Sequence, residues 1–140
     1  MSEIKVDTLT GKTTAGDITV TSEGGAATMQ MQQGLAKSWV NLNGSGTIAI
    51  RDSLNVASLT DYGTGDYRAV FTNSMNNVNH SIQVTTAVSD SPTAVFQAGT
   101  SQTLFSSGAN AFSSYVSSTG GSCVAIDAGV VNITVHGDLA

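Results

Sequence analysis

Apolar and polar residues alternate along much of this 140-residue chain, in runs that are separated by short clusters of Gly, Asn, Asp and Ser. Alternation with a period of two is typical of β-strands that bury one face, whereas the helical spacing i, i+3, i+4, i+7 is almost absent. The 15 glycines and the single proline fit frequent turns. Short strands with regular turns predict an all-β fold, an antiparallel β-sandwich of jelly-roll-like type.

The alternating runs predict a set of short strands. They cover residues 3–8, 17–22, 35–43, 46–53, 54–61, 66–73, 80–88, 111–118, 122–127 and 130–137. The side chains expected to share a face are Ser38, Val40 and Leu42; Leu54, Val56 and Ser58; Tyr67, Ala69 and Phe71; Ile82 and Val84; and Val131, Ile133 and Val135. Between two of the strands, the segment YGTG predicts a hairpin turn in which Gly63 and Gly65 supply positive φ angles.

Residues 1–33 differ from the rest because they contain no aromatic residue and few large apolar ones. A segment of this size cannot offset the entropy of ordering it by burying its own side chains. Such a segment is either disordered or shares a core with identical copies, and its two β alternations disfavour disorder. We therefore expect residues 1–33 to form an extended N-terminal β segment, a stalk intertwined with identical copies, and residues 34–140 to form a β-sandwich domain. Met29 and Met31 are candidate anchors of the shared interface, in a segment, AATMQMQQG, that fits either a strand or one helical turn.

Charged residues make up only 11% of the chain, and the net charge is -5. Because no basic patch exists, we expect neither nucleic acid nor an anionic membrane surface as a partner. The start, MSEIKVDTLT, lacks the apolar core of a signal peptide, and Asp127 interrupts the longest apolar stretch. We therefore expect synthesis in the cytoplasm and no membrane insertion. The lone Cys123 lies in an apolar run, where we expect a small buried residue.

The residues predict neither an enzyme nor a metal site. No G-x-S-x-G motif occurs, and we expect the two histidines, His80 and His136, to be exposed structural residues. Asp61 and Asp66 flank the hairpin turn, where a solvated tip favours a plain turn over a calcium site or a pair of catalytic carboxylates. No cofactor is expected, although a threefold axis could still gather one His or Asp from each chain around an ion.

A surface that binds sugars without cutting them is a further hypothesis. Tyr62, Tyr67 and Tyr115 could stack on pyranose rings, with Asn, Ser and Gln as hydrogen-bond partners. Tyr62 is the leading candidate because it lies at the predicted exposed turn. Tyr62, Asp61 and Asp66 are therefore the candidate contacts for a receptor.

The segment LAKSWVNLNGSGTIAIRDSLNVASLTDYGTGDYRAVFTNSM resembles one that recurs in tail-fibre and related structural proteins of tailed bacteriophages, many of them marine. The match runs from Ala36 to Tyr67. It departs from the family pattern at Ser38, Leu42, Leu54 and Tyr62, and only Tyr62 changes the polarity. The opening, IKVDTLTGKTTAGDITV, also resembles the N-terminal attachment or shaft segments of such proteins.

The resemblance implies a non-enzymatic virion protein, a short fibre or knob that is commonly a homotrimer and attaches to other virion proteins by its N-terminal segment. Trp39 could fill a core between sheets, and Arg51, placed with Asp52 at a turn, could bind backbone carbonyls or a carboxylate of a neighbouring chain. Three copies could contact a host-surface glycan with avidity. Two alternatives stay open: a capsid decoration or cement protein, and a monomeric carbohydrate-binding module.

Overall fold

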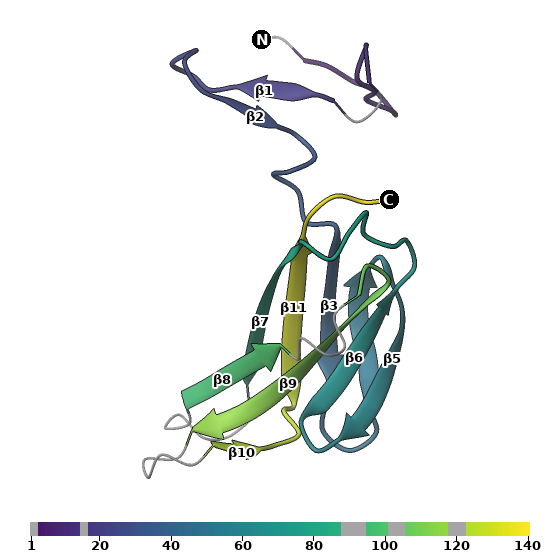
Figure 1. Ribbon diagram of the computed structural model, residues 1–140, viewed down its shortest axis with the longest axis vertical. Coiled ribbons are helices and arrows are strands. Elements are labelled where there is room, and N and C mark those ends of the chain that lie inside the picture. The colour runs from purple at the N-terminus through teal and green to yellow at the C-terminus, as the bar shows by residue number, and fades with distance from the viewer. Residues whose placement is uncertain (1–2, 15–16, 88–94, 101–105, 118–122) are drawn as a thin grey trace. The chain divides into compact units, whose positions relative to one another are not determined.

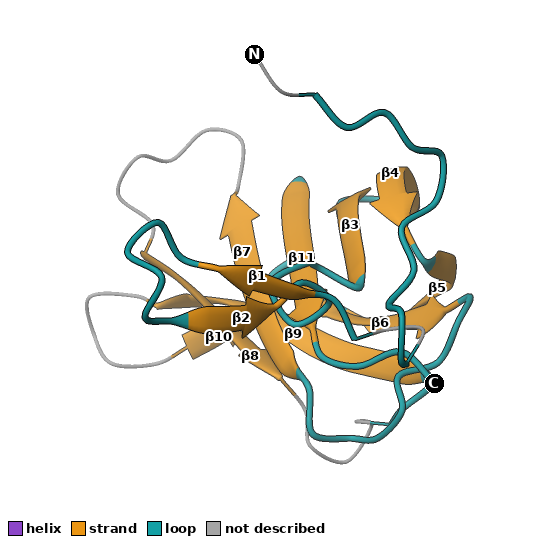
Figure 2. Ribbon diagram, turned by 90° about the horizontal axis from the view of Figure 1, so that it is seen from above, coloured by secondary structure: helices purple, strands orange, loops and turns teal. Residues whose placement is uncertain are grey.

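A computed structural model describes residues 3–14, 17–87, 95–100, 106–117 and 123–140 (Figure 1). The chain divides into two compact units, Met1–Leu35 and Ala36–Ala140, which we call the N-terminal unit and the C-terminal unit. Across the described ranges the chain forms antiparallel strands joined by turns and loops, with no helix (Figure 2). The all-β fold class predicted from the alternation is therefore confirmed.

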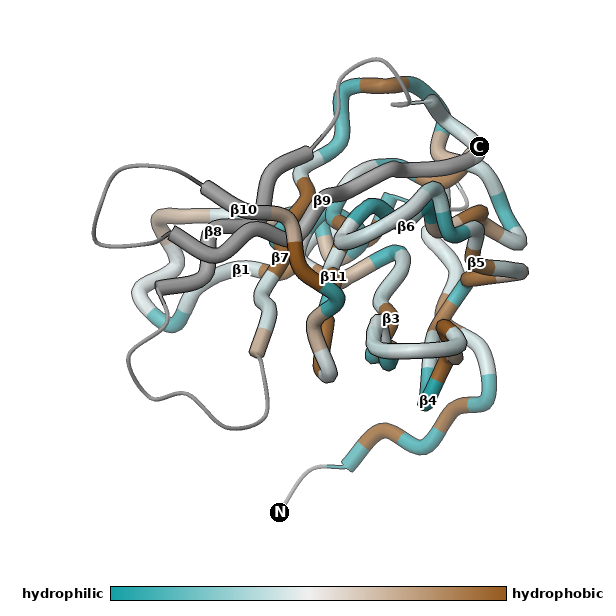
Figure 3. Tube along the Cα trace, turned by 90° about the horizontal axis from the view of Figure 1, so that it is seen from below, coloured by the Kyte–Doolittle hydropathy of each residue, from teal (hydrophilic) through white to brown (hydrophobic). Residues whose placement is uncertain are grey.

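The described residues form eleven strands. They are β1 (Thr19–Thr21), β2 (Thr28–Gln30), β3 (Ser38–Asn43), β4 (Ala49–Leu54), β5 (Val56–Gly63), β6 (Asp66–Phe71), β7 (Ser81–Ala87), β8 (Val95–Thr100), β9 (Ala109–Ser117), β10 (Cys123–Ala125) and β11 (Val130–His136). The expected strand over residues 3–8 is wrong, because that stretch pairs with no other strand although its hydropathy alternates (Figure 3). In contrast, β8 forms where the sequence predicted no strand.

The N-terminal unit is built around one hairpin, in which β1 pairs with β2 from Thr19↔Gln30 to Thr21↔Thr28. Asp17 extends this pairing, because its carboxylate accepts a hydrogen bond from the side-chain amide of Gln30. The segment AATMQMQQG, which fitted either a strand or a helical turn, forms strand β2 and then a turn over residues 31–34. The hairpin carries few buried side chains, because all three residues of β1 are exposed.

The C-terminal unit contains two antiparallel sheets. The four-stranded sheet has the order β4-β3-β11-β7, so β11 lies between strands that precede it by many residues. The five-stranded sheet has the order β10-β9-β6-β5, and β8 pairs with β9 outside this order. The hairpin between β5 and β6 closes at Gly63↔Asp66, where the sequence predicted it.

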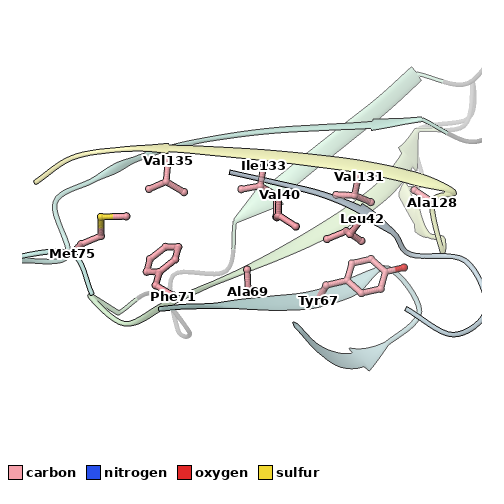
Figure 4. Close-up of a cluster of buried hydrophobic side chains, with 10 residues drawn as sticks. All are labelled: Val40, Leu42, Tyr67, Ala69, Phe71, Met75, Ala128, Val131, Ile133 and Val135. Carbon is pink, nitrogen blue, oxygen red and sulfur yellow. The ribbon is translucent and has the colours of Figure 1, made fainter. Parts of the chain in front are cut away.

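One hydrophobic core draws on both sheets of the C-terminal unit (Figure 4). Its buried members are Val40 and Leu42 of β3, Tyr67, Ala69 and Phe71 of β6, Val131, Ile133 and Val135 of β11, and Met75 and Ala128 from loops. In Figure 4 the side chains of β11 and of β6 point toward one another across this core. The expected shared faces of β3, β6 and β11 are thus confirmed, and Ile82 and Val84 of β7 pack against the same core.

The face of β3 that carries Trp39 is turned away from this core. Ser38, Val40 and Leu42 are buried, whereas Trp39 and Asn41 are half-buried on the opposite face. The expectation that Trp39 fills the core between sheets is therefore wrong, because Val40 and Leu42 occupy that face and side chains alternate strictly along a strand. Its role at an interface with another chain stays a prediction.

The expected common face of Leu54, Val56 and Ser58 is also wrong. Leu54 ends β4 in one sheet and Val56 begins β5 in the other, with Asn55 between them at φ 58°. The register of β5 then shifts between Val56 and Ser58, so Val56 and Leu59 pack on the core while Ser58 is exposed. A bulge of this kind changes which side chains face inward.

Candidate functional site

The predicted receptor-contact residues lie at the tip of the β5–β6 hairpin. Gly63 and Gly65 have φ angles of 131° and 70°, so both supply the positive φ that the sequence predicted. The carboxylate of Asp61 accepts a hydrogen bond from the backbone N–H of Gly63 at 2.9 Å, which orders the turn. Tyr62 is 49% exposed, whereas Asp66 is half-buried where β6 begins. The tip therefore presents one aromatic side chain to solvent and uses one carboxylate to hold its own backbone.

Tyr67 lies directly across the hairpin from Asp61 but is fully buried. Its hydroxyl lies 2.7 Å from the carbonyl oxygen of Gly44 and 3.0 Å from Oδ1 of Asp127. Burial raises the pKa of Tyr67 well above its ordinary value, and the hydrogen bond and negative charge of Asp127 raise this pKa further. The hypothesis that Tyr67 stacks on a sugar is therefore wrong, and this side chain is part of the core.

The carboxylate of Asp127 joins the Tyr67 hydroxyl to the hairpin turn. Its Oδ1 also accepts the backbone N–H of Gly65 at 2.8 Å, so one oxygen holds both the core tyrosine and the tip. Asp127 stood out in the sequence only as an interruption of an apolar run. A polar residue at such a position signals a specific hydrogen-bonding role, but its partner lies 60 residues away along the chain.

Position 44 must be a glycine because its backbone lies against the end of the Tyr67 ring. A Cβ atom at this position would lie 2.5 Å from the hydroxyl oxygen of Tyr67 and 2.9 Å from the carbonyl oxygen of Ala128. The backbone N–H of Gly44 also donates to that Ala128 carbonyl at 2.9 Å. The segment after β3 therefore packs against the Tyr67 ring end with no room for a side chain.

Asn55 links the two sheets where the chain crosses between them. Its Nδ2 donates to the carbonyls of Lys37 at 3.1 Å and Asn73 at 3.0 Å, and its Oδ1 accepts the backbone N–H of Asn73 at 2.7 Å. Asparagine tolerates the left-handed backbone found here better than most residues. The side chain thus bonds three backbone groups, one just before β3 and two just after β6.

Arg51 lies within β4, beside a register shift between Asn41 and Leu42 of the neighbouring strand. Its guanidinium donates to the carbonyl of Leu42 from Nη1 at 3.1 Å and to the carbonyl of Gly129 from Nη2 at 2.6 Å. The expected placement of Arg51 at a turn is wrong, whereas its expected binding to backbone carbonyls is confirmed. In this structure the side chain ties β4 to the segment that leads into β11.

The two methionines of the N-terminal unit differ in exposure. Met29 is 54% exposed, and its thioether lies over Gly34, where an added Cβ would be 3.0 Å from the Met29 Cε atom. Met31 is half-buried in the turn that follows β2. Their role as anchors between chains stays a prediction.

The histidines are half-buried rather than exposed as expected. Phe71 packs edge-on against the His80 ring, with centroids 6.3 Å apart, and Nδ1 of His80 lies 3.1 Å from the carbonyl of Asn77. Within the described ranges, no three His, Cys, Asp or Glu side chains gather in a way that could hold a metal ion. The expectations for the side chains of Tyr115 and Cys123 lie outside the described part of the structure.

No protein-family model, curated protein sequence or solved structure matches this chain. The part of the chain that the structure describes contains no helix both long and apolar enough to cross a membrane.

Proposed function

We propose that this chain is a non-enzymatic virion structural protein of a tailed bacteriophage. It forms a short trimeric fibre or knob, in which the N-terminal unit attaches to the particle and joins three copies. The C-terminal unit is the knob, with its two sheets stacked in a jelly-roll-like β-sandwich. The single core shared by β3, β11 and β6 supports stacked sheets, and the pairings of β11 with β3 and β7 supply crossover connections.

The exposed apolar surface of the N-terminal unit is the observation that carries the proposal. Ile4, Val6, Leu9, Val20 and Met29 are all exposed, from 45% for Val20 to 86% for Ile4. Val20 and Met29 face each other across the hairpin and so form one apolar pair. A two-stranded hairpin without a covering layer is only marginally stable in water. Identical copies packed around an axis would supply the missing apolar surface, as the resemblance to phage fibre proteins implies.

The proposal is tested by the copy number of the full chain in solution, measured by light scattering and native mass spectrometry. Val20→Asp places a charge on the apolar pair and is expected to convert trimers to monomers. Thr21→Asp is the matched control, because it places the same charge on the opposite face of the same strand and should leave the trimer intact. Removal of residues 1–33 should also give monomers. A wild-type chain that is monomeric at all concentrations would overturn the trimeric fibre.

A second candidate is a monomeric carbohydrate-binding module, favoured by the exposure of Tyr62 at the hairpin tip. That function predicts a monomer whose melting temperature rises with a sugar ligand, and loss of this rise in Tyr62→Ala. A monomer with no sugar-dependent shift would instead favour a capsid decoration protein, whose N-terminal segment packs on the shell. The copy number and the sugar-dependent melting shift, taken together, therefore distinguish the three functions.

A further inference from the structure

The strand register places six outward side chains of the four-stranded sheet in two adjacent rows. Thr134, Trp39 and Leu54 lie side by side across β11, β3 and β4, and Asn132, Asn41 and Asp52 form the next row. We call these six residues the outer patch. It lies on the face opposite Val40 and Ile133, which point into the core.

The outer patch has the dimensions of a small binding surface. Neighbouring strands lie about 4.8 Å apart, and side chains two positions apart along a strand lie about 7 Å apart. A pyranose ring placed over Trp39 would therefore set its ring hydroxyls over the row that contains Asn41 and Asn132. Because the patch lies on the two central strands β3 and β11 and on the edge strand β4, and not on a loop, the paired backbone holds its side chains in fixed relative positions.

The first row offers apolar contact. Trp39 is half-buried, so part of its indole faces solvent, and its cross-strand neighbour Leu54 is 47% exposed. Aromatic side chains supply a large and rigid contact area at low cost in conformational entropy. The flat indole fits the C–H face of a sugar ring, which is the apolar side of that ligand.

The second row offers paired hydrogen-bonding groups. Nδ2 of Asn41 donates to Oδ1 of Asn132 at 2.5 Å, which orients both amides. This bond leaves the Oδ1 of Asn41 as an acceptor and the Nδ2 of Asn132 as a donor for a ligand. Asp52 is exposed, and its Oδ1 accepts the backbone N–H of Ser53 at 2.8 Å, which leaves its second oxygen as an acceptor for a ligand. Sugar hydroxyls donate and accept, so they can pair with all three groups.

The charge of the outer patch selects against acidic ligands. The patch contains one carboxylate and no cation, and the nearby guanidinium of Arg51 is bound to two backbone carbonyls. The chain as a whole carries a net charge of -5. Within the six residues of the patch, phosphates, sulfates and uronic acids would therefore meet no positive partner. A second protein copy would have to bury the amides and the carboxylate, which costs free energy unless each finds a partner.

We infer that the outer patch binds neutral oligosaccharides, with Trp39 as the stacking platform and Asn41, Asn132 and Asp52 as hydrogen-bond partners. The inference goes beyond the proposed virion role and does not depend on trimer formation. It also differs from the Tyr62 module, because Tyr62 belongs to β5 of the five-stranded sheet. Each of the two surfaces can be changed without touching the other.

Trp39 is the single tryptophan of the chain, so its fluorescence reports directly on this patch. The full chain is titrated to millimolar concentrations with maltopentaose, cellopentaose, xylopentaose and chitopentaose, and with a heparin fragment as the acidic comparison. We expect at least one neutral pentasaccharide to shift the Trp39 emission and to give a saturating isotherm by calorimetry. We expect no response to heparin. The inference is overturned if none of the four neutral sugars changes the Trp39 emission or gives a calorimetric isotherm. It is also overturned if only heparin gives a response.

Four variants then locate the sugar. Asn132→Ala changes an exposed side chain that bonds to Asn41 within the described ranges, so it should fold normally and weaken binding by about tenfold. Trp39→Ala should abolish binding, which is measured by calorimetry because this variant has no tryptophan. Trp39→Phe should retain part of the binding. Tyr62→Ala should bind as wild type. The assignment to the outer patch is overturned if Asn132→Ala and Trp39→Phe both bind as wild type. It is also overturned if Tyr62→Ala alone loses binding.

The copy number separates this inference from the proposed function. Light scattering on the same samples reports whether the chain is a trimer. A monomer that binds sugar would support the inference about the outer patch and overturn the trimeric fibre. A trimer that binds no sugar would support the fibre and overturn the inference about the outer patch.

Discussion

Replacement of Tyr67 by Phe tests whether the bonds of a single hydroxyl stabilise the C-terminal unit. The change keeps the buried ring among Leu42 and its other core neighbours and removes only the O–H group. That group lies 2.7 Å from the carbonyl oxygen of Gly44 and 3.0 Å from Oδ1 of Asp127. The variant therefore leaves a buried carbonyl and a carboxylate with one donor fewer between them.

The expected loss follows from the burial of the Tyr67 hydroxyl and the Gly44 carbonyl, because the residue Asp127 is itself exposed. A hydrogen bond to a charged group contributes about 1.5–3 kcal/mol, and a buried acceptor without its partner costs about 1–3 kcal/mol. Because the two acceptors share one donor, these values overlap, and we expect a loss of about 2–3 kcal/mol. For a unit of this size, such a loss lowers the melting temperature by about 10 °C or more.

Urea unfolding followed by Trp39 fluorescence measures the free energy of unfolding of this unit directly. Tyr62→Phe is the matched control, because it removes a hydroxyl from an exposed ring and should change stability by less than about 0.5 kcal/mol. Asp127→Asn keeps an acceptor oxygen for both of its donors and should lose less than Tyr67→Phe. A Tyr67→Phe variant within about 0.5 kcal/mol of wild type would refute the reasoning.

Three further predictions concern the same unit. Gly44→Ala should lower the free energy of unfolding by about 1–3 kcal/mol, because its Cβ would overpack against Tyr67. Gly129→Ala is the control and should be near neutral, because its Cβ meets nothing within 4 Å. Equal urea midpoints for the two variants would contradict this prediction. Asn55→Ala should be about 1–2 kcal/mol less stable than Asn55→Gly, because only the alanine strains the left-handed backbone; the reverse order by thermal melting would refute it. Because the folded pKa of Tyr67 is raised, its contribution to stability is complete below about pH 10, the unfolded value, and declines above it. The free energy of unfolding should therefore fall more steeply above about pH 10 in wild type than in Tyr67→Phe, and parallel curves would exclude this cause.

The sequence predicted the strands that have one face in the core. In β6 and β11 the alternation is complete, since Tyr67, Ala69 and Phe71 are buried on one side and Val131, Ile133 and Val135 on one side. Alternation is produced by burial of one face, so it is strongest where that burial is strongest. It does not guarantee a strand, because residues 3–8 alternate without a partner strand to bond their backbone.

Alternation also leaves open which face points inward. In β3 the two faces carry Val40 and Leu42 on one side and Trp39 on the other, and the sequence suggested that Trp39 fills the core. The structure buries the aliphatic face because it meets the core side chains of β6 and β11. Strand β8 was not predicted because its sequence, VFQAGT, shows no regular alternation of apolar and polar residues.

The polar links were beyond sequence reasoning because they join distant segments. Asp127 and Tyr67 are 60 positions apart, and Arg51 and Gly129 are 78 apart. No local spacing indicates such partners. The turn at Gly63 and Gly65 was predictable, because its positive φ angles and the bond of Gly63 to Asp61 are local. The bond of Gly65 to Asp127 was not predictable, because it spans 62 positions.

The place of β11 has a consequence for how the chain folds as it is synthesised. This strand is made after all the others, yet it pairs with both β3 and β7 and supplies three core residues. Its bond to Asn41 spans 91 positions, so the four-stranded sheet cannot close until Asn132 has left the ribosome. Until then, the apolar face of β3 and one of its edges stay open to other nascent chains. A ribosome that stops before Val130 would release a chain without its central strand, and such a chain is a substrate for chaperones or for aggregation.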